Sequence, residues 1–389
     1  MHLPELTDAE ASLLGEMRGR LTAEIESAGG ALPFDRYMET ALYEPGLGYY
    51  VNGRRKFGEA GDFVTAPEVS PLFSRCLARQ VAECLRNLGG GSVLEVGAGS
   101  GRMATDMLTE LETLDALPER YQILELSPSL QQAQFDTLSH GVPHLLPRVV
   151  WLTEMPAAGF HGVLVGNELL DAMPVHRFRR VEGAWQELAV GVEGGTFCDR
   201  WKPLHSPGLA EALEKLWPDA TGVSEGYSSE LNMRLAPWLK AVAASLDAGY
   251  VILIDYGYAQ REYYHVERSL GTLICHFRHR AYADPYLLPG LQDMTANVDF
   301  TALAEAAVAL GFELSGYTTQ AHFLIDSGLE QILSTSDPDD LKRHLSLMQG
   351  VKKLTLPGEM GERFKVMALA RGTRATLSGF RSRDMRERL

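Results

Sequence analysis

The ten residues Ser92–Gly101, which read SVLEVGAGSG, decide the fold that we expect for this chain. A short apolar run ends at three glycines spaced G-x-G-x-G, and residues 102–108 then carry apolar side chains at helical spacing. The pattern predicts a buried strand, a tight turn and the start of a helix. Because glycines lack a Cβ atom and the first N–H groups of a helix have no partner within it, a ligand can lie against bare backbone here.

The spacing of the glycines distinguishes between two kinds of ligand. A dinucleotide fingerprint, G-x-G-x-x-G, would place its third glycine at Arg102, but the third glycine of this chain is Gly101. The stretch instead resembles motif I of the class I S-adenosylmethionine (SAM) methyltransferases, in which the loop surrounds the amino-acid part of SAM. The resemblance implies that the cofactor-binding residues here are Glu95, Gly97, Ala98, Gly99 and Gly101. The alternative is an ordinary turn between a strand and a helix, with no ligand.

A carboxylate near the end of the next predicted strand, 121–127, supports a nucleotide ligand. Doubly wound folds place a ribose-binding carboxylate about 20 residues after the glycine loop, and Glu125 lies close to that position. A carboxylate there can accept hydrogen bonds from both ribose hydroxyls. Alone, Glu125 is better interpreted as a solvated acid at a strand end. Together with the glycines it favours a ribose site, to which we add the neighbouring Leu126.

Composition places the chain among ordinary globular proteins. Its 389 residues are enough for one large core with insertions or for two domains. The formal net charge of −15 at pH 7 discourages non-specific binding to a phosphate backbone, so nucleic acid is not the expected partner. Such a surface is more compatible with a basic protein or peptide.

Cysteine usage and the first residues of the chain favour a reducing compartment. The cysteines, Cys76, Cys84, Cys198 and Cys275, have no C-x-x-C spacing. No local pattern supplies a third ligand beside His276 and His279, so we expect no metal site. No run approaches 18 apolar residues, and the acidic start differs from a signal or transit peptide. We therefore expect a cytoplasmic protein.

Motifs along nearly the whole chain resemble one family. Gly61–Ser70 (GDFVTAPEVS), Leu94–Gly101 and Glu125–Ser127 come first, and Asn167–Val175 (NELLDAMPV) is the most distinctive. Later matches are IDYG at 254–257, GTL at 271–273 and QDMTANVDF at 292–300. Together they resemble the MidA-like (DUF185) family, SAM-dependent methyltransferases related to the mitochondrial complex I assembly factor that methylates an arginine. Asn297 departs from this pattern, because we expect a histidine there.

Strands that alternate with helices predict a parallel α/β sheet with right-handed crossovers. The family resemblance implies a Rossmann-like class I methyltransferase fold, with a seven-stranded, mostly parallel sheet whose last strand is antiparallel. We expect 91–174, 246–320 and 362–372 to form the core. Residues 1–90 should form an N-terminal helical and loop region that closes over the cofactor. The insertions 175–245, with a hairpin over 178–192, and 321–361 should form a roof over the substrate.

Two acidic residues after the predicted strand 162–166 are the candidates for catalysis. Glu168 and Asp171 lie three residues apart, so a helical turn would place them on one face. Paired carboxylates can hold a guanidinium group bidentately and direct one nitrogen at a methyl donor. The alternative for Asp171 is that it braces the turn before Pro174. Asn167 either braces the backbone or donates a hydrogen bond at the methyl-transfer site, where it would also meet the cofactor.

Asp62 and Thr65 are the remaining cofactor candidates. They could close over SAM from the N-terminal segment. The alternative, which we weigh about equally, is that both side chains satisfy backbone amides of a turn.

These observations predict an enzyme that uses SAM to methylate an arginine on a protein partner. The family resemblance suggests a subunit of a respiratory complex as that partner. Two alternatives remain open. One is methylation of a small molecule by the same core, and the other is a non-catalytic assembly protein that keeps SAM as a structural ligand.

Overall fold

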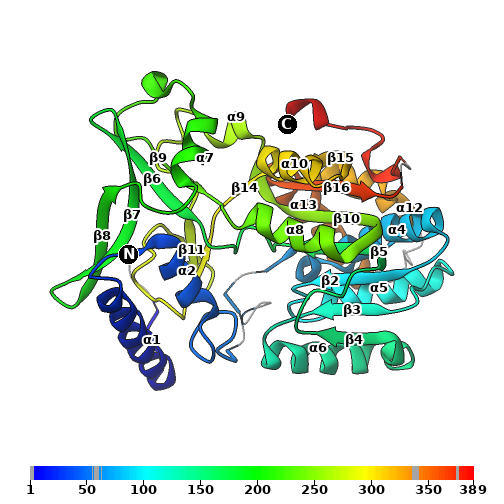
Figure 1. Ribbon diagram of the computed structural model, residues 1–389. Coiled ribbons are helices and arrows are strands. Elements are labelled where there is room, and N and C mark those ends of the chain that lie inside the picture. The colour runs from blue at the N-terminus through cyan, green and yellow to red at the C-terminus, as the bar shows by residue number, and fades with distance from the viewer. Residues whose placement is uncertain (1–3, 55, 57–60, 63, 335–340, 374–375) are drawn as a thin grey trace. The chain divides into compact units, whose positions relative to one another are not determined.

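Figure 1 shows the computed structural model, which describes residues 1–389 except 1–3, 55, 57–60, 63, 335–340 and 374–375. The chain divides into two compact units, each assembled from several stretches. Unit 1 comprises Met1–Phe63, Asp171–Leu235 and Arg261–Asn297, and unit 2 comprises Val64–Leu170, Ala236–Gln260 and Val298–Leu389. Within the described ranges, every helix is too short or too polar to cross a membrane.

Unit 2 is built on a sheet in which seven strands have the order β4-β3-β2-β5-β10-β16-β15. In that order they comprise Val149–Leu152, Tyr121–Leu124, Ser92–Val96, Phe160–Asn167, Leu246–Tyr258, Phe364–Arg371 and Glu313–Thr319. The strands from β4 to β10 are parallel, whereas β16 runs antiparallel to both of its neighbours. The predicted fold class and the antiparallel strand are thus confirmed. A short strand that we did not expect, β14 (Val298–Asp299), pairs with the end of β10.

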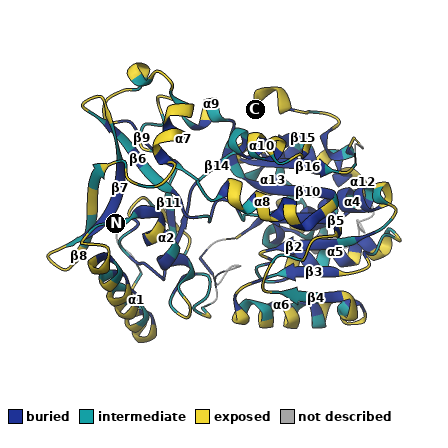
Figure 2. Cartoon of the chain, viewed as in Figure 1, coloured by how far each residue is buried: buried dark blue, intermediate teal, exposed yellow. Residues whose placement is uncertain are grey.

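Helices cover this sheet on both faces, since the consecutive residues Val251–Ile254 of β10 are all buried. Figure 2 shows the strands largely in dark blue, with the exposed residues on the outer faces of the helices. The helices are α3 (Ala66–Val69), α4 (Pro71–Leu88), α5 (Arg102–Thr113), α6 (Pro128–Gly141), α10 (Phe300–Ala309), α11 (Gln320–Asp326), α12 (Leu329–Ser334), α13 (Leu341–Thr355) and α14 (Met360–Arg363). Helices α8 (Leu235–Ser245) and α9 (Gln260–Tyr263) lie at the boundaries of the unit, and 3₁₀ turns occur at Pro143–Arg148, Ser378–Phe380 and Arg386–Arg388.

The local sequence sets both ends of α4. The hydroxyl of Ser70 accepts a hydrogen bond from the N–H of Leu72 at 3.3 Å, and Pro71 occupies the first helical position. Gly89 ends the helix in the left-handed conformation, with φ of 77°. Between these ends the apolar face of α4 joins the core of unit 2.

The two units differ from the domains that we expected from the sequence. Residues 64–90 belong to unit 2, because buried side chains of α4 join the core around the sheet of that unit. Residues 321–361 also belong to unit 2, since buried side chains of α11 and α12 enter the same core. Residues 261–297, expected in the core, contribute to unit 1. The expected roof over the substrate stays a prediction.

Unit 1 contains two antiparallel sheets. One comprises β1 (Leu32–Pro33), β6 (His176–Val181), β7 (Ala184–Glu193), β8 (Thr196–Pro203) and β9 (Ser228–Leu231), and the other β11 (Ile274–Phe277), β12 (Arg280–Tyr282) and β13 (Asp293–Thr295). The predicted hairpin corresponds to β6 and β7. The helices are α1 (Asp8–Ser27), α2 (Phe34–Tyr43) and α7 (Leu209–Leu216), with a 3₁₀ turn at Ala220–Gly222. Buried faces of α1 and α2 pack with both sheets in one apolar core.

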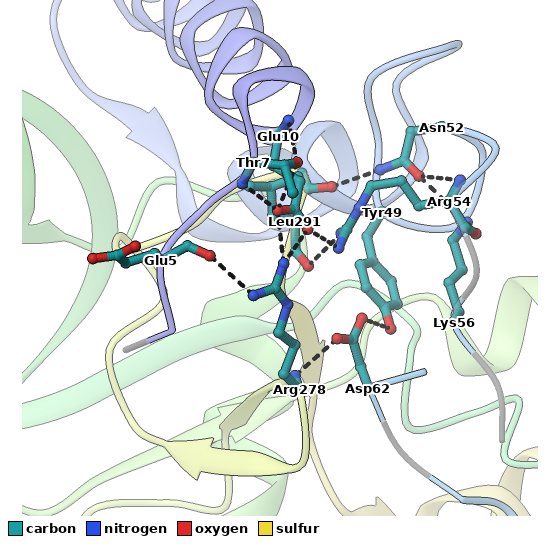
Figure 3. A network of polar contacts seen from close by, with 11 residues as sticks. Glu5, Thr7, Glu10, Tyr49, Asn52, Arg54, Lys56, Asp62, Arg278 and Leu291 are labelled. Carbon is teal, nitrogen blue, oxygen red and sulfur yellow. Dashed lines mark hydrogen bonds and ion pairs between the residues drawn. The ribbon is translucent and has the colours of Figure 1, made fainter. Parts of the chain in front are cut away.

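A buried carboxylate connects α1 to the rest of unit 1 (Figure 3). Glu10 is 7% exposed and pairs with Arg54 at 2.6 Å and with Arg278 at 2.7 Å. It also accepts a hydrogen bond from the N–H of Thr7, which completes a capping box. Burial alone would raise the pKa of the Glu10 carboxyl. Hydrogen bonds from Thr7 and Arg278 and the charge of Arg54 outweigh burial and hold the pKa below its usual value.

We expect Glu10→Gln to lower the melting temperature by several degrees at pH 7. Breaking a fully buried ion pair costs about 3–5 kcal/mol, and roughly half of that is expected because both arginines are partly exposed. Since folding lowers the pKa of Glu10, its contribution is present above the usual value of 4.5 and is lost as the pH falls through the folded-state pKa. The difference between variant and wild type, measured by scanning fluorimetry, should therefore shrink below pH 4.5. The control Glu16→Gln changes an exposed carboxylate of the same helix and should have little effect at either pH. A pH-independent difference would contradict this account.

Candidate active site at the carboxyl edge of the unit 2 sheet

Three loops leave the sheet of unit 2 at the same edge. Parallel pairing aligns Val96 of β2 with Leu124 of β3 on one side and with Gly166 of β5 on the other. The glycine loop, Glu125 and Asn167 directly follow these positions in the chain. Ligands of open α/β sheets bind outside this carboxyl edge, so the structure places the main sequence-predicted residues of unit 2 where a ligand would lie.

The glycine loop presents backbone that other residues adopt only with strain. The φ angles of Gly97, Gly99 and Gly101 are 72°, 53° and 80°. A Cβ atom on Gly101 would lie 2.9 Å from the Cα atom of Gln134, so α6 also excludes a side chain there. Gly101, which has no side chain, is the N-cap residue of α5. Ala98 of the same loop is buried in the core of unit 2.

Gln134 of α6 is the residue that the sequence did not reveal as part of this site. Its buried side chain donates to the carbonyl oxygen of Gly99 at 3.1 Å and to Oε2 of Glu125 at 3.0 Å. Its amide oxygen accepts the indole N–H of Trp151 at 3.0 Å. One amide therefore fixes the glycine loop and the candidate ribose-binding carboxylate relative to each other. Helical spacing places this glutamine on the inner face of α6.

The carboxylate of Glu125 is held by its neighbours in the chain. Its Oε1 accepts the N–H of Ser127 at 2.9 Å, while Oε2 accepts Gln134. Leu126 beside it is 65% exposed, which is unusual for an apolar side chain of this size. The edge of β3 thus presents a fixed carboxylate next to an open apolar surface.

Glu95 lies inside unit 2, completely buried. Its Oε2 accepts the hydroxyl hydrogen of Tyr121 at 2.6 Å, and its Oε1 has no hydrogen-bond partner among the described residues. Burial raises the pKa of Glu95 to about 7, which the hydrogen bond from Tyr121 opposes. Direct contact of this carboxyl with a cofactor stays a prediction.

The turn after β5 is not helical, so the expectation that Glu168 and Asp171 share a helical face is wrong. Glu168 has φ of 50°, a left-handed conformation that is rare for residues other than glycine. The turn is fixed by β10: Glu168 donates its N–H to the carbonyl oxygen of Ile254 at 2.9 Å. The carboxylate of Asp255 accepts the N–H groups of Leu169 at 3.1 Å and Leu170 at 2.9 Å.

The side chain of Asn167 donates to Oε1 of Glu168 at 3.2 Å, and its own amide oxygen is buried without a partner among the described residues. The amide therefore restrains the carboxylate of Glu168 at the end of β5. Asp255, which the sequence suggested only as part of a motif, is the residue that holds this turn.

Asp171 belongs to unit 1 and is 2% exposed. Its carbonyl oxygen accepts the N–H of Ala296 at 2.9 Å. Its charge acts on Asp293 of the same unit, whose pKa is raised to about 7 by burial and then by Asp171. Both interpretations of Asp171, a substrate-holding carboxylate and a brace for the turn before Pro174, stay predictions.

Asp62 holds a turn in unit 1 (Figure 3). One oxygen of its carboxylate accepts the N–H of Arg278 at 2.8 Å and the other accepts the hydroxyl of Tyr49 at 3.0 Å. Its carbonyl oxygen accepts the N–H of His279 at 2.8 Å. Arg278 and His279 form the tip between β11 and β12 with φ of 46° and 60°, so Asp62 holds a strained backbone in place. This geometry corresponds to the alternative in which Asp62 satisfies turn amides.

Thr65 and Glu68 lie at the start of α3 in unit 2. Thr65 precedes the first residue of the helix and is buried, without a capping hydrogen bond from its hydroxyl. The carboxylate of Glu68 accepts a hydrogen bond from the hydroxyl of Ser100 in the glycine loop. Glu68 thus supports the glycine loop from the motif at Gly61–Ser70.

Comparisons with known proteins connect these positions with one family of enzymes. A model of the family described as "Putative S-adenosyl-L-methionine-dependent methyltransferase" matches residues 76–318. The Drosophila melanogaster protein named "Protein arginine methyltransferase NDUFAF7 homolog, mitochondrial" is 29% identical, over 96% of this chain and 89% of its own length. The human protein named "Protein arginine methyltransferase NDUFAF7, mitochondrial" is 28% identical, over 91% of this chain and 83% of its own length.

A solved structure agrees over the whole chain. The crystal structure of a COG1565 superfamily protein from Burkholderia thailandensis, bound to S-adenosyl-homocysteine, is 42% identical. It covers 100% of both chains with a TM-score of 0.95. The cytoplasmic location expected from the sequence is contradicted by the curated relatives, because those from Drosophila melanogaster, Danio rerio and Homo sapiens are all named as mitochondrial proteins.

The carboxyl edge of unit 2 fits SAM. A loop whose glycines leave bare backbone, a helix start with glycine at the N-cap and a fixed carboxylate directly after the adjacent strand suit an amino-acid group and a ribose. The family model spans more than half of the chain. The chain therefore belongs to this family and is a SAM-dependent methyltransferase.

Proposed function

We propose that this methyltransferase acts on arginine side chains of a protein partner. The observation that carries the proposal is the restrained carboxylate of Glu168, held at the end of β5 directly beside the strand that leads into the glycine loop. The names of the curated relatives, protein arginine methyltransferases at 27–29% identity, favour the same substrate. A carboxylate is the group that best orients a guanidinium.

We assign the cofactor contacts as follows. The backbone of the loop, with Gly97, Ala98, Gly99 and Gly101, holds the amino-acid part of SAM, while Glu95 supports this loop from the interior. Glu125 accepts both ribose hydroxyls, and the exposed side chain of Leu126 packs against the base. Asn167 and Thr65 complete the surroundings of the cofactor. For Asp62 we propose a positioning role in unit 1 in place of the direct contact expected from the sequence.

Bound SAM supplies a methyl group on a positively charged sulfur, already activated for transfer. The protein has to orient the acceptor nitrogen in line and exclude water. We propose that Glu168 holds two N–H groups of the guanidinium, so that the remaining nitrogen faces the methyl group. For Asp171 we propose a separate role in holding substrate within unit 1. The positive charge of the arginine persists through the reaction, and one proton leaves the methylated nitrogen.

The proposed substrate class is tested by incubating the protein with radiolabelled SAM and a lysate of source cells that lack it. We expect label on a discrete protein band and, by mass spectrometry, methylated arginine in that band. Label confined to small molecules would contradict the proposal, and so would labelled residues other than arginine.

Replacing Glu168 separates cofactor binding from transfer. We expect Glu168→Gln to keep the affinity for SAM, measured by calorimetry, and to reduce the rate of transfer about 100-fold, the usual effect of removing one group that stabilises a transition state. Glu168→Gly should lose transfer equally, yet should unfold at the same or a higher temperature, because glycine relieves the left-handed backbone strain.

Glu182 provides the matched control. It is an exposed glutamate in the hairpin of β6 and β7 and has φ of 53°, so Glu182→Gln and Glu182→Gly make the same chemical changes at the same backbone conformation. Both control variants should methylate at the wild-type rate. Wild-type transfer by Glu168→Gln would exclude the proposed role of this carboxylate.

Gln134 should determine the affinity for SAM and not the rate of the chemical step. Gln134→Leu removes the hydrogen bonds to Gly99 and Glu125, and we expect the dissociation constant of SAM to rise about tenfold, which is roughly 1.4 kcal/mol. The control Gln132→Leu makes the same change at an exposed position of α6. The affinity of both variants for SAM is measured by calorimetry. Equal affinities would show that the hydrogen bonds of Gln134 have no part in cofactor binding.

A further inference from the structure

Two carboxylates of unit 1, Asp62 and Asp171, lie close enough to a third, Asp293, for their charges to act on it. Each is 2% exposed. Burial, with the negative charges of Asp171 and Asp62, raises the pKa of Asp293 to about 7. Buried charges in proteins are normally paired with opposite charges, since removing them from water is costly.

The partners of Asp62 and Asp293 are neutral. Asp293 accepts the hydroxyl of Tyr50 and the N–H of Met294, both at 2.9 Å. Asp62 accepts the hydroxyl of Tyr49 and the N–H of Arg278. Within the part of the chain that the structure describes, neither carboxylate forms an ion pair with a lysine, arginine or histidine. Hydroxyl and amide donors satisfy oxygen atoms but do not neutralise the charge of these two carboxylates.

Thr295 provides an independent observation. Its side chain is 1% exposed, and its hydroxyl has no hydrogen-bond partner among the described residues. Side chains alternate along β13, so Asp293 and Thr295 lie on one face of the strand and Met294 on the other. Pairing with β11 places His276 opposite Asp293 on that same face. This hydroxyl is therefore free to form a hydrogen bond with a group that lies beside Asp293.

We propose that Asp293, Tyr50 and Thr295 form a binding site for a guanidinium group, with which unit 1 binds an arginine side chain of the protein partner; the identity of the ligand rests on the proposed function. A guanidinium is planar and has five N–H donors. It can donate twice to the carboxylate of Asp293 and once to the hydroxyl of Thr295. Its charge offsets that of the carboxylates where burial keeps water away, and such charge-assisted hydrogen bonds are strong.

The site can be tested without the protein substrate. The full chain is titrated by calorimetry with ethylguanidine, which carries a guanidinium and no other charged group, at pH 8, where the Asp293 carboxyl is largely ionised. We expect wild type to bind ethylguanidine and to bind butylamine, with its single ammonium, at least fivefold more weakly. Asp293→Asn should weaken the binding of ethylguanidine at least tenfold, and Thr295→Val about fivefold.

Thr295→Val keeps the test independent of folding. It removes a hydroxyl that has no partner, so the melting temperature should stay the same or rise, while ethylguanidine binds more weakly. Thr318→Val is the matched control, because Thr318 of β15 in unit 2 is also buried with an unpartnered hydroxyl. Its affinity for ethylguanidine should equal that of wild type, and SAM should bind all the variants equally.

The proposal is wrong if wild type does not bind ethylguanidine or if both Asp293→Asn and Thr295→Val bind it as wild type does. The lysate experiment is interpreted separately. Ethylguanidine binding that depends on Asp293, with no methylated arginine in any protein, would reject the proposed function and retain the cation site. Methylated arginine with unchanged binding in both variants would reject the site alone.

Discussion

The parallel pairing of β2 with β3 and β5 is the constraint on which the candidate active site depends. A single ladder hydrogen bond contributes only about 1 kcal/mol net, but the register has larger consequences. A shift of one residue would turn the buried Val93 and the hydrogen-bonded Glu95 to the opposite face of the sheet. Helices cover both faces of this sheet, so a shifted strand would misplace buried side chains, and burial therefore fixes the register. The register in turn places the starts of the three loops at the same edge of the sheet.

Hydrogen bonds from polar side chains then fix the positions of the loops at this edge of the sheet. Gln134 connects α6 to the glycine loop and Glu125, and Glu68 supports the loop from α3. Asp255 holds the turn after β5 through two backbone N–H groups. Each of these contacts joins residues that are far apart in the chain, so the geometry of the edge depends on the packing of α3, α6 and β10 as well as on the loops themselves.

The sequence was sufficient for the parts of the structure that follow from local rules. Apolar runs and glycines predicted the central strands of the sheet and the glycine turn, because these depend on neighbours in the chain. Gln134 and Asp255 could not be assigned roles, since a buried glutamine or aspartate acts through partners that only the fold brings near. The helical turn expected at Glu168 failed for a related reason. Hydrogen bonds from β10 outweigh the intrinsic cost of a left-handed glutamate.

The route of the chain through the two units has a consequence for its synthesis. The chain passes between the units at residues 63–64, 170–171, 235–236, 260–261 and 297–298. Domains that are continuous in sequence can fold one after another as they emerge from the ribosome. Here unit 1 lacks β13 until residue 295 has been made, and the sheet of unit 2 lacks β16 until residue 371. Apolar surfaces of both units therefore stay uncovered until these late segments are made, and exposed apolar surface of this kind favours aggregation.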